Sequence, residues 1–199
     1  MKSLSLFAAV VLCVTLLIAA LPTEAEAKIY EDTLRLHILA ASDSEEDQAL
    51  KLTVRDKILK KYGSVLSKAE SRRDAEELTG ALLSDIESDA QRWVSEAGYR
   101  YSVNVTLTEE WYDTRVYEDF TLPSGVYTSL RVIIGEGEGK NWWCVMYPPL
   151  CIDIATEVAP ADDSLIDYTD EEIKLITDNG YNIKFKLLEI ISALFSKNG

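Results

Sequence analysis

The sequence predicts an α+β fold in which helices cover a mostly antiparallel sheet, with one disulfide-closed loop. Apolar and polar residues alternate with a period of two in several runs, which is the pattern of strands with one buried face. Two longer stretches have apolar residues at every fourth position, which is the pattern of amphipathic helices. Two cysteines that flank a Pro-Pro pair supply the closed loop, because two fixed φ angles favour a bent segment.

The first strand is expected at residues 33–41, where leucine and isoleucine alternate with polar side chains. A helix should follow, because Ser42 and Glu45 have the spacing of a capping box. Its apolar residues recur every four positions as far as Tyr62, and Gly63 should end it.

A second helix is expected over about residues 70–97, with Gly98 at its C-terminal end. The alternation of residues 99–108 is the clearest strand signal in the chain. Further elements complete a predicted meander with the helices on one side: strands at residues 111–120 and 126–134, a turn at 122–125, and a loop at 135–141 that leads to the disulfide segment.

The N-terminal 27 residues have the pattern of a secretory signal peptide. An apolar run at residues 4–21 follows Lys2, and Ala25-Glu26-Ala27 has the spacing of a cleavage site. The run is also near the minimum length of a membrane span, so the segment is expected to be removed or kept as an anchor. Either outcome places the rest of the chain outside the cytoplasm.

The remainder divides at about residue 157. Residues 28–157 should form the folded domain, and residues 158–199 an acidic linker and a C-terminal amphipathic helix. That last helix either packs on the domain or offers a docking face.

Cys144 and Cys151 are expected to form a disulfide. Cys13 lies in the signal segment, so an exported chain keeps an even pair of cysteines in an oxidising compartment. His37 is the only histidine, so a zinc site would lack ligands, and we expect no metal or cofactor.

The charge and the motifs argue against several function classes. A net charge of −14 repels nucleic acid and anionic lipid headgroups. Gly135-x-Gly-x-Gly139 is not a phosphate loop, because Glu136 and Glu138 would repel phosphate. A serine triad lacks its G-x-S-x-G elbow. A pair of carboxylates for glycoside hydrolysis stays open, because such pairing is spatial.

The candidate contact residues are Trp142, Trp143, Arg131, His37, Asp43 and Asp47. Adjacent tryptophans on a strand point to opposite faces, so one can belong to the core while the other anchors a partner. The alternative is that both cap the core. His37 can meet Asp43 and Asp47 in a charged group that either fixes the turn or is recognised by a partner. Arg131 either pairs with a carboxylate of the sheet or is an exposed contact.

Three stretches carry a family resemblance. They are Arg35-Leu-His-Ile-Leu-Ala-Ala-Ser-Asp-Ser44; Leu122-Pro-Ser-Gly-Val-Tyr127 with Leu130-Arg-Val-Ile-Ile-Gly135; and Gly137-x-Gly-x-Asn-Trp-Trp-Cys144 with Pro148-Pro-Leu-Cys151. Together they cover about residues 33–151, and they resemble the stage II sporulation protein R family of endospore-forming bacteria. The chain departs from the family pattern at Ala41, where Asn is usual, and at Ser124 and Tyr147.

The resemblance implies a secreted signal rather than an enzyme. Such a protein is made in the forespore and exported into the space between the two septal membranes. There it activates a membrane-embedded aspartic protease that processes the precursor of sigma factor E. The rival expectations are a secreted cell-wall hydrolase, with a carboxylate cleft beside Glu109 or Asp113, and a structural envelope protein.

Overall fold

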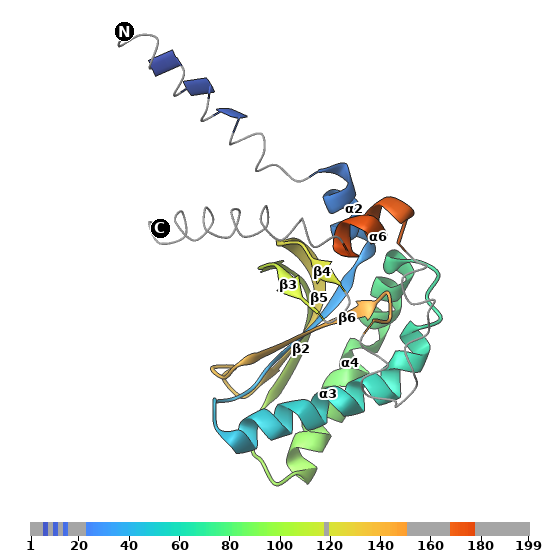
Figure 1. The fold of residues 1–199 in the computed structure, drawn as a ribbon. Helices are drawn as coiled ribbons and strands as arrows, with labels where there is room; N and C mark the ends of the chain where they lie inside the picture. Colours follow the sequence, from blue (N-terminus) through green and yellow to red (C-terminus); the bar gives the residue numbers. More distant parts are fainter. Residues whose placement is uncertain are drawn as a thin grey trace. The chain divides into compact units, whose positions relative to one another are not determined.

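The computed structural model describes residues 6–7, 10–11, 14–15, 23–117, 120–150 and 168–177 (Figure 1). The chain divides into two compact units. The larger comprises Tyr30–Tyr112 and Val126–Thr169, and the smaller comprises Met1–Ile29, Asp113–Gly125 and Asp170–Gly199. Within the stretches described, no helix has both the length and the apolar character needed to cross a bilayer.

A four-stranded sheet forms the centre of the larger unit, in the order β2-β5-β1-β6. β1 (Leu34–Leu39) lies between β5 (Gly125–Ile134), to which it is parallel, and β6 (Asn141–Tyr147), to which it is antiparallel. The sheet is therefore mixed, and the prediction of a mostly antiparallel sheet was wrong. All six residues of β1 are buried, as expected for a strand in the interior of a sheet.

β2 (Val103–Tyr112) is the edge strand beside β5. The Ser102 carbonyl, before the start of β2, accepts the Gly135 N–H, after the end of β5, at 2.8 Å. The two strands therefore run antiparallel. The predicted boundary at residue 108 was wrong, because β2 continues to Tyr112.

Two long helices, α3 (Glu45–Leu66) and α4 (Arg72–Glu96), lie on one side of the sheet (Figure 1). α4 agrees with the second predicted helix, and Gly98 follows it with a φ of +89°. α3 differs at both ends. Its N-cap is Ser44, whose side chain accepts the Asp47 N–H at 3.2 Å, and the helix runs through Gly63. An interior glycine lowers helix propensity, but packing of the buried face keeps the helix intact.

The smaller unit contains α6 (Asp170–Thr177) and a two-stranded hairpin of β3 (Arg115–Val116) and β4 (Thr121–Leu122). The predicted continuous strand at residues 111–120 is therefore wrong. Trp111 and Tyr112 form the end of β2, Asp113 and Thr114 are not strand, and Arg115 and Val116 form the separate strand β3. α6 contacts β4, and it lies within the stretch that was expected to begin as an acidic linker.

α2 (Glu24–Asp32) contains the predicted cleavage motif Ala25-Glu26-Ala27. Thr23 and Glu26 bond reciprocally, side chain to backbone, in a capping box at its start. Most of the predicted signal segment, and residues 178–199 with the end of the predicted C-terminal helix, lie outside the described residues. Removal of the segment stays a prediction.

Candidate partner-binding surface

Three of the candidate residues meet on the face of the sheet that points away from α3 and α4. His37 on β1 stands in register with Arg131 on β5 and with Trp143 on β6. Side chains in register on adjacent strands share a face, so these three are neighbours. His37 lies about a hundred positions before the other two in the sequence, and the strand order brings it between them.

Glu110 on β2 holds this group together. Its Oε2 lies 3.0 Å from His37 Nδ1, and its Oε1 lies 3.2 Å from Arg131 Nε. The other ring nitrogen of His37, Nε2, donates to Asn141 Oδ1 at 3.1 Å. The imidazole stacks on the Trp143 ring with a centroid distance of 3.7 Å and an interplanar angle of 20°. We name these five residues the polar cluster: His37, Glu110, Arg131, Asn141 and Trp143.

The polar cluster has a buried centre and exposed margins. His37 is 5% exposed and the Glu110 side chain 14%, whereas the Arg131 side chain is 37% exposed and Asn141 is exposed. Burial by itself raises the pKa of Glu110. The hydrogen bond from His37 and the charges of His37 and Arg131 outweigh burial, so the pKa of this carboxyl lies below its ordinary value. Glu110 is therefore the anionic centre of the cluster at neutral pH.

An aromatic layer supports the polar cluster from the side of Arg35. The guanidinium of this fully buried arginine lies 3.9 Å from the Tyr112 ring centroid and 4.8 Å from that of Tyr127. The Tyr112 ring packs edge-on against Trp143, at 4.7 Å between centroids, and its hydroxyl bonds Ser129 Oγ at 2.6 Å. Such packing holds Trp143 and His37 in one arrangement.

Trp142 lies on the opposite face of β6 from Trp143. It is in register with Ile38, and the Arg55 guanidinium of α3 lies 4.2 Å from its ring centroid. The expectation that the two tryptophans point to opposite faces is confirmed. Both are half-buried, so neither is a simple core residue. They lie on β6, where the sequence predicted the disulfide segment rather than a strand.

Asp43 lies in the loop between β1 and α3, and Asp47 lies in the first turn of α3. The β1–α3 loop and α3 are bonded to the loop between β5 and β6. Asp43 Oδ1 accepts the Lys140 N–H at 2.7 Å, and Lys51 Nζ donates to the Lys140 carbonyl at 2.8 Å. The Gly139 N–H donates to the carbonyl of Ala40 at 2.9 Å. The carboxylate that reaches His37 is Glu110, rather than either of these aspartates.

A family model for stage II sporulation protein R matches residues 30–157. The chain belongs to this family. Stage II sporulation protein R of Bacillus subtilis strain 168 is 29% identical over 187 residues, which cover 84% of each chain. No solved structure matches the chain. The family match includes the whole polar cluster and the two hydrogen-bonded loops, one between β1 and α3 and one between β5 and β6, which we name the joined loops. The sporulation family is therefore established for the part of the chain that carries the candidate site.

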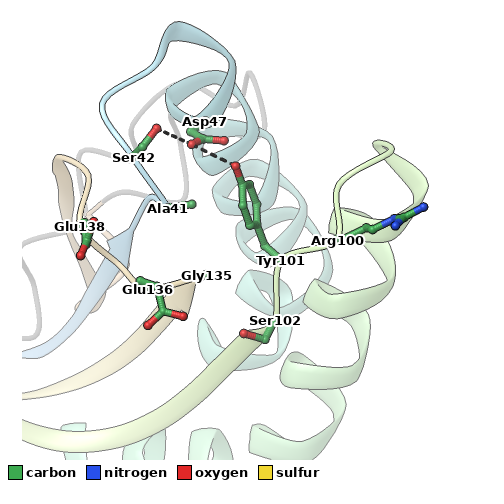
Figure 2. Close-up of a pocket in the computed structure, with 9 residues that line it drawn as sticks. All are labelled: Ala41, Ser42, Asp47, Arg100, Tyr101, Ser102, Gly135, Glu136 and Glu138. Atoms are coloured by element: carbon green, nitrogen blue, oxygen red, sulfur yellow. Dashed lines mark hydrogen bonds between the residues drawn. The ribbon is translucent and has the colours of Figure 1, made fainter.

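Beside the joined loops, the family domain has a pocket of about 370 Å³. Asp47 is buried at its wall, where its Oδ2 accepts from Ser42 Oγ at 2.5 Å and from the Tyr101 hydroxyl at 3.4 Å. Figure 2 shows Arg100 directed away from the other lining side chains. The lining residues are Ala41, Ser42, Asp47, Arg100, Tyr101, Ser102, Gly135, Glu136 and Glu138. Neither Glu109 nor Asp113, where a hydrolase cleft was considered, is among them.

Sequence reasoning missed Glu110, Asn141 and the supporting Tyr112. The signal that could have found Glu110 and Tyr112 is the alternation of β2, once it is continued past residue 108. Cys144 is buried on β6, whereas Cys151 lies outside the described residues. The disulfide between them therefore stays a prediction.

Proposed function

We propose that this protein is an exported sporulation signal that activates a membrane-embedded aspartic protease, the one that processes the precursor of sigma factor E. It acts in the space between the two septal membranes, by binding and without chemistry of its own. Membership of the stage II sporulation protein R family supports the sporulation role. In this proposal the Cys144–Cys151 disulfide stiffens the chain beyond β6.

The polar cluster is the observation that carries the proposal. Its margins are the exposed Asn141 and the partly exposed Arg131 and Trp143, and they are attached to a buried centre of fixed geometry. Both ring nitrogens of His37 are engaged within the cluster, an arrangement that suits recognition better than proton transfer to a substrate. A preorganised surface of this kind binds without the entropy cost of ordering its side chains.

Activation then follows from differential affinity. If the protein binds the active conformation or dimer of the protease more tightly than the inactive one, it shifts the population toward the active state. The shift is limited by the ratio of the two affinities, so a well-ordered surface with a charged and aromatic centre is the feature that the mechanism requires.

The test is reconstitution. Purified protein lacking residues 1–27 is added to membranes that contain the protease and the sigma precursor, and the rate of precursor cleavage is measured. We expect cleavage with the unmodified protein, and at least about tenfold less with Arg131→Ala or Trp143→Ala, because truncated anchor residues at interfaces cost about 1.4 kcal/mol or more.

The matched control is Arg73→Ala, which removes an arginine of α4 whose side chain is 85% exposed. It should leave cleavage unchanged. Absence of cleavage with the folded, unmodified protein would refute the proposed function. Full cleavage with both cluster variants would show that the polar cluster is not the contact.

A further inference from the structure

Along the outer edge of β2, as far as the chain is described, side chains of α4 accept hydrogen bonds from the amides of the first half of the strand but not from those of the second half. Because the Ser102 carbonyl points toward β5, alternation directs the backbone groups of odd-numbered residues of β2 away from the sheet. The first two such amides are bonded by side chains of α4: the Val103 N–H donates to Gln91 Oε1 at 2.9 Å, and the Val105 N–H donates to Glu87 Oε2 at 2.9 Å.

Farther along the strand, the amides directed away from the sheet are those of Leu107, Glu109 and Trp111. Among the residues that the structure describes, their outward amides have no partner comparable to the α4 side chains. Glu109 is exposed, and Trp111 is 54% exposed. An edge of this kind, with neither proline nor lysine to protect it, is a template for pairing with another strand.

We propose that the segment Leu107–Trp111 is the docking site of an extended segment from the partner, which adds a fifth strand to the sheet. This inference rests on the proposed function, because it assigns the segment to the membrane-embedded protease. Main-chain hydrogen bonds would supply much of the affinity, and alternate side chains the specificity.

The side chains of β2 define the chemistry of that segment. Leu107, Glu109 and Trp111 share one face of the strand, with the carboxylate between two apolar groups. Opposite charges directly across a strand pair stabilise it, and aromatic and aliphatic pairs do the same. The docking segment should therefore read apolar, any, Lys or Arg, any, apolar. Glu110, on the other face, is already engaged by His37 and Arg131.

A second copy of this chain fits the edge less well. Pairing of two β2 strands about a two-fold axis near Glu109 would place the Glu109 carboxylates of the two copies opposite each other. Like charges in that position are destabilising. The net charge of −14 adds repulsion between whole molecules. A heterologous, basic segment avoids both penalties.

The experiment compares four variants in the reconstituted cleavage assay. Glu109→Pro removes an outward amide without touching a bond to β5, Glu109→Lys reverses the charge, and Trp111→Ala removes the exposed ring. Glu96→Lys, at an exposed glutamate of α4, is the charge-matched control. Each edge variant should raise the protein concentration needed for half-maximal cleavage by about tenfold or more, whereas Glu96→Lys should leave it unchanged.

Two further measurements keep the outcomes distinct. Thermal unfolding shows whether Glu109→Pro has folded, and Glu109→Lys carries the test if it has not. Hydrogen–deuterium exchange of residues 107–111 should slow when membranes with the protease are added, compared with membranes without it.

If the unmodified protein activates the protease and all three edge variants match it, the edge is not the docking site and the proposed function stands. If the protein sediments as a dimer that Glu109→Pro dissociates, the occupant is a second copy and the inference is overturned. If the unmodified protein fails to activate, the proposed function itself fails.

Discussion

Replacement of Gly139 by alanine should push the loop between β5 and β6 away from the loop between β1 and α3. A Cβ at this position would lie 2.2 Å from the Ser42 carbonyl oxygen and 2.5 Å from its carbon. These are backbone atoms, so no side-chain rotation relieves the contact. The φ of Gly139 lies outside the left-handed region, and the cost is therefore steric rather than conformational.

The magnitude follows from the bonds that the clash would stretch. Relief requires the loops to move apart by roughly 1 Å, since carbon contacts are normally about 3.5–4 Å. That movement would break the 2.9 Å bond from the Gly139 N–H to the Ala40 carbonyl and the 2.7 Å bond from the Lys140 N–H to Asp43. A neutral bond contributes about 1 kcal/mol and one to a charged group about 1.5–3 kcal/mol, so we expect a loss of about 2–4 kcal/mol.

Thermal unfolding followed by circular dichroism measures this loss. In a chain of this length, 1 kcal/mol changes the Tm by about 2–4 °C, so Gly139→Ala should lower it by about 5–15 °C. Gly80→Ala is the control, because Gly80 is an exposed interior residue of α4 with open space around it. It should stabilise the protein by about 0.5–1 kcal/mol. A Gly139→Ala protein within about 2 °C of the unmodified Tm would refute the reasoning.

Three further predictions concern the polar cluster and its surroundings. Glu110→Gln should cost about 1–3 kcal/mol at pH 7 in urea unfolding. The folded-state pKa of Glu110 lies below its unfolded value of about 4.3. This loss of stability should therefore be full above about pH 4.3 and shrink as the pH falls through the folded pKa. A loss that grows on acidification would contradict the lowered pKa of Glu110. Tyr112→Phe removes the buried bond to Ser129 Oγ and should cost about 1 kcal/mol, whereas no change in urea midpoint would show that the bond is not needed. Trp142→Ala should lower stability while leaving cleavage per folded molecule unchanged, and Trp143→Ala should lower cleavage per folded molecule; the reverse pattern would exchange their roles.

Local patterns in the sequence predicted some of the elements on which the site is built. β6 was not predicted as a strand, but the rule that adjacent strand residues point to opposite faces holds for Trp142 and Trp143, because β6 is regular at this point. The periodicity of α4 predicted its course closely, since its apolar side is buried against β2 and α3.

The strand order could not be predicted in the same way. A meander of neighbouring strands is the simplest reading of the chain, yet β1 enters between β5 and β6. The contact between His37 and Glu110 spans 73 residues and crosses β5, so it depends on that order alone. The true N-cap, Ser44, lies two residues from the predicted Ser42, because Ser42 uses its hydroxyl to bond Asp47 instead.

The central proposal is that this member of the stage II sporulation protein R family activates the protease by binding to it and staying bound. The most direct test is the extent of sigma-precursor cleavage as the ratio of this protein to the protease is varied in reconstituted membranes. A binding activator predicts that the cleavage rate rises until the two proteins are near equal amounts and then stays constant. Complete cleavage at the full rate with a small fraction of one molecule per protease would show that the protein turns over, and it would contradict the account.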